Sequence, residues 1–153
     1  MHNFEQVKDV LDHGRKLHAE LRKFYDSLNG QNQQDRVRMV LDYLSRHEQN
    51  REEALERFEH DARKGILETW MQYAPSSTVE QKLKATCIAP NMSVDEVLKL
   101  AMEFDNALVE LYKEAAREAE EDHVKAVFQD LVKMENGEKE RLARDTMSML
   151  REI

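Results

Sequence analysis

The sequence predicts an all-α protein, a four-helix bundle built from two repeated helical hairpins with a long crossover. Apolar residues recur at spacings of three, four and seven, the period of an amphipathic helix, and no useful length alternates with the period of two typical of a strand. Only four Gly and two Pro occur in 153 residues, so turns are few. This length suits one domain, residues 1–153, with a sizeable core.

The two halves of the chain match at an offset of 87 positions, without a gap. At that offset Tyr25 falls on Tyr112, and Glu48 falls on Glu135. The matched apolar pairs are Val7 and Val94, Val10 and Val97, Leu11 and Leu98, Leu21 and Leu108, Val37 and Val124, Val40 and Val127, Leu44 and Leu131, and Leu55 and Leu142. Matched residues at helical spacing indicate a duplicated helical hairpin. Two such hairpins make a four-helix bundle, with the matched acids near its axis.

The first hairpin is expected at about residues 3–73. Its first helix begins near Asn3, whose side chain can cap the free backbone amides, and ends at Gly30, which accepts the left-handed conformation that closes a helix. The second helix opens after Asn32. Residues 66–73 are expected to continue that helix or to form a short extra one.

The crossover is expected at about residues 74–92, where the composition changes. This stretch holds both prolines and the single cysteine, Cys87, and is expected to include a short helix at residues 79–86. Because the link is long, the second hairpin can lie beside the first, in the order up-down, crossover, up-down. A lone cysteine excludes an internal disulfide and fits a reducing compartment.

The second hairpin is expected at about residues 93–153. Ser93 and Glu96 form a capping box, because each side chain can satisfy the backbone amide of the other residue at the start of a helix. The boundary between the third and fourth helices falls at residues 117–123, and the fourth helix runs almost to Ile153.

The charge distribution argues against several partners. The formal net charge is −8, and basic residues are scattered among acids rather than gathered in a stripe with interleaved aromatic residues. Neither nucleic acid nor an anionic membrane surface is therefore an expected partner. The longest uncharged stretch, around residues 71–79, is too short and too polar to span a membrane. With no secretory signal visible at the N-terminus, a cytoplasmic location is expected.

Two acids lie on the apolar stripes of the second and fourth helices. Glu48 follows Leu41 by seven positions and Leu44 by four, and Glu135 lies on the corresponding stripe. One interpretation is that each is a solvated residue near a helix edge. The other is that both are buried, and a buried carboxylate is costly unless a cation or a donor meets it. A positive group or a proton is then expected between them.

The segments HAELRKFYDSL, LSRHEQNREEAL, DNALVELYKEA and LVKMENGEKERL carry a family resemblance. Over nearly its whole length, the chain resembles the rubrerythrin-like branch of the ferritin-like superfamily. The resemblance implies a ferritin-like four-helix bundle, with a Glu seven residues before a Tyr on helices one and three, and Glu-x-x-His on helices two and four. In that family these six side chains hold two irons, which the glutamates of helices two and four bridge.

This chain keeps only part of the pattern. The two tyrosines and the two bridging acids match. Four other ligand positions depart from it: His18 and Asp105 stand where the family has Glu, and Arg51 and Glu138 stand where it has His. The dinuclear centre is therefore expected to be degenerate.

The departures limit the metal chemistry. Arg51 has no lone pair for a metal, but its guanidinium could replace a cation and bind Glu48 or Glu135 in a forked pair. The candidate metal ligands are His18, Glu48, Asp105, Glu135 and Glu138. Such oxygen-rich ligands suit one hard cation such as magnesium, calcium or manganese, or one iron. His47, next to Glu48, is expected to be a packing or surface residue.

Two classes of function remain open, and the sequence leaves open whether the protein is an enzyme. The first is a non-catalytic binding or structural role, with no metal or one divalent ion (iron, manganese or another) and with a homodimer as the expected assembly. The second is a metal-dependent iron oxidoreductase or iron-handling protein, as the resemblance implies. A two-metal site also stays open if surrogate ligands such as His18 serve. No Cys-x-x-Cys pair exists, so no rubredoxin-type iron centre is expected.

Overall fold

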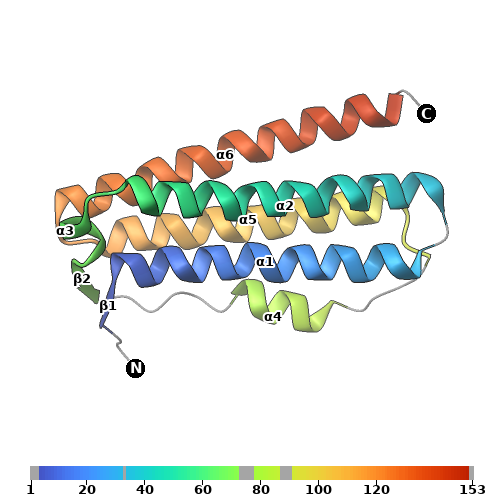
Figure 1. Cartoon of the computed structure of the whole chain (residues 1–153). Coiled ribbons are helices and arrows are strands. Elements are labelled where there is room, and N and C mark those ends of the chain that lie inside the picture. The colour runs from blue at the N-terminus through green and yellow to red at the C-terminus, as the bar shows by residue number, and fades with distance from the viewer. Residues whose placement is uncertain (1–3, 33, 73–77, 87–90, 152–153) are drawn as a thin grey trace.

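The computed structural model describes residues 4–32, 34–72, 78–86 and 91–151. Its elements are β1 (Phe4–Gln6), α1 (Val7–Gln31), α2 (Asp35–Asp61), α3 (Lys64–Leu67), β2 (Trp70–Gln72), α4 (Thr78–Ala85), α5 (Val94–Glu118) and α6 (Asp122–Arg151). The long helices α1, α2, α5 and α6 form a bundle, with α1 packed on α2 and α5 packed on α6 (Figure 1). The predicted all-α bundle of two helical hairpins is confirmed.

The start of the first hairpin differs from the prediction. α1 begins at Val7 and not near Asn3, because residues 4–6 form β1 and pair antiparallel with β2. The amide of Val7 donates to the carbonyl of Thr69 at 3.0 Å, so the backbone at the helix start is bonded to the segment that follows α3. These two three-residue strands are too short to show the alternation that the sequence lacks over any useful length. Of the helix expected over residues 66–73, only Ile66 and Leu67 are helical among the described residues, as the end of α3.

The end of α1 also forms without the predicted left-handed glycine. No glycine in the described part of the chain has a positive φ, and Gly30 lies inside the last turn of α1. The helix is closed by Asn32, whose amide donates to the carbonyl of Leu28 at 3.1 Å. The Asn32 side-chain oxygen then accepts from the amide of Gln34 at 2.9 Å, which turns the chain into α2.

The second hairpin follows the prediction closely. The hydroxyl of Ser93 accepts from the amide of Glu96 at 3.2 Å, and the Glu96 carboxylate accepts from the amide of Ser93 at 3.3 Å. This capping box starts α5, as predicted. The break between α5 and α6 lies at residues 119–121, within the predicted boundary.

The crossover contains the predicted short helix, now seen as α4. It packs against α1 and α5 through Val79, which is buried, and Leu83, which is partly buried. Cys87 lies outside the described residues. In Figure 1, α5 runs in the same direction as α2, and α6 runs in the same direction as α1. The order is thus up-down, crossover, down-up, and the predicted directions of the last two helices are wrong. The reason is that the crossover returns the chain to the end of the bundle where α2 begins.

The core is filled by aliphatic and aromatic side chains from all four long helices. The largest fully buried ones are Tyr25, Tyr112, Phe104, Phe128, Leu11, Leu17, Leu21, Leu41, Leu44, Leu55, Leu108 and Leu111. Halfway along the bundle, ionisable side chains interrupt this apolar packing. No helix among the described residues is both long and apolar enough to cross a membrane.

Candidate functional site

One side chain from α1 joins the two acids that the sequence placed on the core stripes. His18 lies between Glu48 of α2 and Glu135 of α6, and all three are almost completely buried. The Nδ1 atom of His18 lies 2.5 Å from Oε2 of Glu48, and its Nε2 atom lies 3.2 Å from Oε1 of Glu135. An imidazole that faces a carboxylate at both nitrogens can donate to both only as the imidazolium. His18 is therefore a cation bridging two anions.

A second cation binds the same network. Nη2 of Arg51 donates to Oε1 of Glu135 at 3.1 Å, and Nη1 lies 3.9 Å from Oε1 of Glu138. Arg51 is only 3% exposed, so this contact is desolvated and strong. The expected forked pair with one acid does not form, because the two guanidinium nitrogens face different carboxylates. Glu138 remains partly exposed at the edge of the bundle.

The protonation states follow from these contacts. Burial by itself would raise the pKa of Glu135, but the opposing charges and hydrogen bonds of His18 and Arg51 lower it to about 2. Burial would lower the pKa of His18, but Glu48 and Glu135 raise it to about 10. At neutral pH His18 is therefore a cation held against the Glu135 anion.

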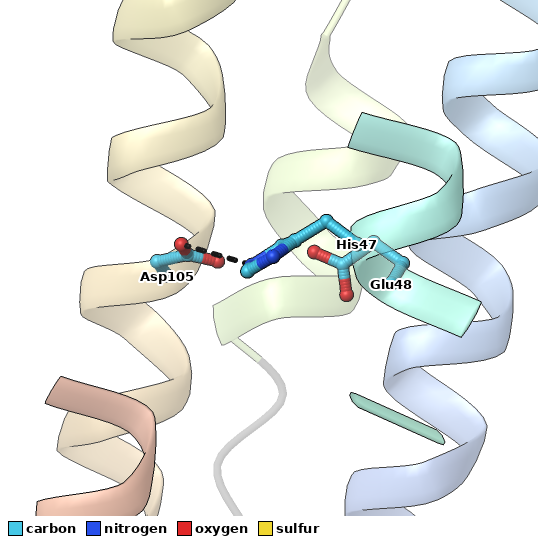
Figure 2. Close-up of side chains that lie close together, drawn as sticks. All are labelled: His47, Glu48 and Asp105. Atoms are coloured by element: carbon cyan, nitrogen blue, oxygen red, sulfur yellow. Dashed lines mark ion pairs between the residues drawn. The ribbon is translucent and has the colours of Figure 1, made fainter. Parts of the chain in front are cut away.

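A second cluster shares Glu48 with this network. His47, Glu48 and Asp105 of α5 each offer a ligand atom, and these atoms all lie within 4.8 Å of one another. Figure 2 shows the His47 ring and the Asp105 carboxylate facing each other, with Nε2 and Oδ2 3.9 Å apart. Oδ2 of Asp105 has no hydrogen-bond partner among the described residues. Three side chains that could hold a cation therefore converge here.

His47 and Asp105 have shifted pKa values in this cluster. Burial lowers the pKa of His47, so its ring is neutral and keeps a lone pair. Burial, and after it the charges of Glu48 and Glu135, raise the pKa of Asp105 well above its ordinary value. Unfavourable burial of like charges is the situation that a bound cation relieves.

A cleft between α2 and α6 reaches this region from solvent. It has a volume of about 540 Å³ and is lined by residues that include Tyr43, His47, Arg51, Glu138 and Arg141. The hydroxyl of Tyr43 donates to Asp145 of α6 at 2.7 Å across this cleft. His47 thus belongs both to the cleft wall and to the buried cluster.

The five predicted ligands do not surround one point. His18, Glu48 and Glu135 meet directly, Glu138 reaches them only through Arg51, and Asp105 faces His47 instead. The sequence indicated His47 only as a packing or surface residue, and the structure buries it, stacks it on Tyr43 and also places it beside Asp105. It lies one position before Glu48, about 100° around α2, and the only signal for it was this adjacency.

Tyr25 and Tyr112, the two tyrosines that match the pattern of the resemblance, are completely buried in the bundle. Burial raises the pKa of Tyr25 well above its ordinary value, with smaller contributions from Glu48 and Asp105. The hydroxyl of Tyr112 points at α1, where a Cβ on Gly14 would lie 2.0 Å from it. Gly14, which the sequence did not single out, is thus required by close approach and not by backbone conformation.

A two-iron centre does not fit these side chains. Both ring nitrogens of His18 face carboxylates, and Arg51 has no lone pair to give to a metal. Glu48 and Glu135, the two carboxylates that the resemblance gives as bridging ligands, are already bound by these internal cations. One ion, held by the separate cluster around His47, is compatible with the geometry.

Together, the long antiparallel helix pairs, the crossover and the acids at mid-bundle define a ferritin-like helical bundle. Among solved structures, the chain is similar to a "putative ferritin-like diiron-carboxylate protein" from Thermotoga maritima. The two share 15% sequence identity with a TM-score of 0.58, over 96% of this chain and 98% of that chain. No protein-family model matches the chain, and no curated protein does. The likeness establishes the fold.

Proposed function

We propose that this protein is a ferritin-like bundle whose two-iron centre has been replaced by internal cations, leaving a non-catalytic binding or structural role with at most one divalent ion. The observation that carries the proposal is His18, which lies 2.5 Å from Glu48 and 3.2 Å from Glu135. The side chain thus stands between the two acids that the family resemblance gives as bridging ligands. Arg51 supplies the second positive charge.

Charge neutralisation by side chains is physically reasonable at this position. Each buried carboxylate would cost several kcal/mol without a partner, and an ion pair with further hydrogen bonds offsets that cost. Unlike a metal, these side chains cannot leave the protein or change oxidation state. The arrangement therefore supports a stable polar core better than redox chemistry.

Several finer assignments belong to the same proposal. The resemblance supports a place in the rubrerythrin-like branch, and the matched halves support an origin by duplication of one hairpin. We further propose a single domain over residues 1–153, a homodimer and a cytoplasmic location. Of the candidate metal ligands His18, Glu48, Asp105, Glu135 and Glu138, we propose that Glu48 and Asp105 are available to a single ion and that the other three belong to the internal-cation core.

Anaerobic loading with ferrous iron, followed by elemental analysis, tests the proposal. We expect fewer than two irons per chain. As a gain-of-function arm, the double variant His18→Glu with Arg51→His restores the family's ligand types on one side and should raise iron content. The matched control His13→Glu with Arg46→His makes the same exchanges away from the centre and should not. Two irons bound by the unmodified chain would refute the proposal.

A second candidate function is a metal-dependent oxidoreductase or iron-handling protein that uses a single ion. The cluster of His47, Glu48 and Asp105 favours it, since nitrogen and oxygen ligands of this kind hold iron in many proteins. The two candidates differ in ferrous oxidation by oxygen, followed by absorbance under stopped flow. A rate above that of buffer, lost in Glu48→Gln, would support the enzyme, whereas a rate equal to that of buffer supports the non-catalytic role.

A further inference from the structure

We infer that His47, Glu48 and Asp105 form a binding site for one divalent transition-metal ion, reached through the cleft between α2 and α6. This inference rests on the proposed function, in that the neighbouring acids are already neutralised by side-chain cations. It deepens that function by giving the single ion a location. His47 has no counterpart in the ligand pattern of the ferritin-like resemblance, so the site is not a remnant of the two-iron centre alone.

The distances suit an ion and do not suit direct bonding. Nε2 of His47 and Oδ2 of Asp105 are 3.9 Å apart, which is too long for a hydrogen bond. Two ligands bound to one zinc at roughly 2.0 to 2.2 Å lie roughly 3 to 4 Å from each other. The ligand atoms of all three residues fall within 4.8 Å of one another, so small side-chain movements would complete such a geometry.

A buried and unpartnered carboxylate oxygen is the second, independent observation. Asp105 is 5% exposed, and its Oδ2 atom has no hydrogen-bond partner among the described residues although it faces His47. An acceptor left in this state is costly, and each such group in a native fold needs an explanation. An ion between Asp105 and His47 supplies one.

Outer contacts hold two of the three ligands in place. The ring of Tyr43 stacks on that of His47, with centroids 6.2 Å apart and planes inclined by 14°. His18 binds Oε2 of Glu48 at 2.5 Å. Contacts of this kind orient metal ligands and are part of functional metal sites.

The charge balance also leaves room for a divalent cation. When a bound ion displaces the proton of Asp105, the acids of the two clusters outnumber the cations by two charges, the groups being Glu48, Asp105, Glu135 and Glu138 against His18 and Arg51. One divalent ion neutralises this remainder. Because one ligand is an imidazole nitrogen and two are carboxylates, zinc, ferrous iron or manganese suits the site better than calcium or magnesium.

Titration calorimetry of the full chain with Zn²⁺ tests the inference, with Co²⁺ absorption as a second readout of coordination. We expect one ion per chain, and at least tenfold weaker binding in His47→Gln and in Asp105→Asn. The control His13→Gln removes another imidazole that lies 3.3 Å from a carboxylate, that of Glu80, and should bind as the parent does. Thermal melts of each variant confirm folding, and Asp105→Asn keeps the side-chain shape.

The outcomes separate this inference from the proposed function. Absence of Zn²⁺ and Co²⁺ binding, or binding unchanged in both His47→Gln and Asp105→Asn, would overturn the site while leaving the internal-cation core intact. Loss of binding in His13→Gln would place the ion elsewhere and also overturn it. Two ions per chain would refute the proposed function itself, and this inference with it.

Discussion

Replacing Arg51 by alanine tests whether a side-chain cation stabilises the centre. The substitution leaves Glu135 buried with one of its two cationic partners missing. Breaking a buried pair by removing one partner costs about 3 to 5 kcal/mol. Because Glu135 keeps His18, and because Glu138 is partly exposed and can be solvated, we expect a loss at the lower end, about 3 kcal/mol.

The magnitude can be measured in two ways. Urea unfolding followed by circular dichroism gives the free energy of unfolding, and for a chain of this size a loss of about 3 kcal/mol lowers the melting temperature by about 6 to 12 °C. Arg46→Ala is the matched control, because Arg46 is an exposed residue of the same helix and lines the same cleft. Exposed substitutions of this kind change stability by about 0.5 kcal/mol or less.

A double-mutant cycle isolates the pair itself. Arg51→Ala and Glu135→Ala, alone and together, should show a coupling of about 1 to 3 kcal/mol, since residues in one buried network are not additive. If Arg51→Ala melts within a few degrees of Arg46→Ala and the cycle shows no coupling, the guanidinium does not stabilise the centre. The reasoning about internal cations would then be wrong.

Three further predictions follow from named contacts. The pKa of His18 is raised from 6.5 to about 10, so its contribution to stability is fully present below pH 6.5 and is lost as the pH rises to about 10. The free energy of unfolding, measured in urea across that range, should therefore fall more steeply with pH for the parent than for His18→Gln. Parallel curves for the two proteins would contradict this. Gly14→Ala should destabilise by about 1 to 3 kcal/mol, because the new Cβ would lie 2.0 Å from the hydroxyl of Tyr112, whereas Gly30→Ala in the same helix meets open space and should be neutral or slightly stabilising. In thermal melts, an equal effect of the two alanines would show that the close approach is absent. Ser93→Ala removes the hydroxyl that caps α5 and should cost about 1 kcal/mol in urea unfolding, and an unchanged midpoint would mean that the cap contributes nothing.

The bundle could be predicted because its signals are local and repeated. The core stripes of α1 and α5 recur every three or four residues, and the Ser93 capping box starts α5 through contacts within one turn. The strands β1 and β2 could not be found in this way, because three residues are too few to establish a period and their pairing joins residues 4–6 to residues 70–72. The directions of α5 and α6 depend on the path of the crossover, which no local pattern encodes.

The candidate site, like the fold, could be predicted where its signals are local and not where they depend on tertiary packing. Burial of Glu48 and Glu135 was predictable as one of two interpretations, since an acid on an otherwise apolar stripe lies on the side of the helix that faces the core. His47 was not, because a residue 100° from the centre of that stripe faces the core or solvent depending on where α5 lies. The split of the Arg51 guanidinium between two acids is also a tertiary result, set by the position of α6 relative to α2.

A chain that carries its own counter-charges need not wait for a metal in order to fold. In proteins whose acids depend on a bound ion, assembly is tied to metal supply, and chelators unfold them. Here His18 and Arg51 are present as soon as the polypeptide is synthesised, so the native state should persist in metal-starved conditions and in the presence of chelators. Any ion that binds beside His47 would then add to stability with the logarithm of its concentration above the Kd, as an ordinary ligand does, and would not act as a condition for the fold.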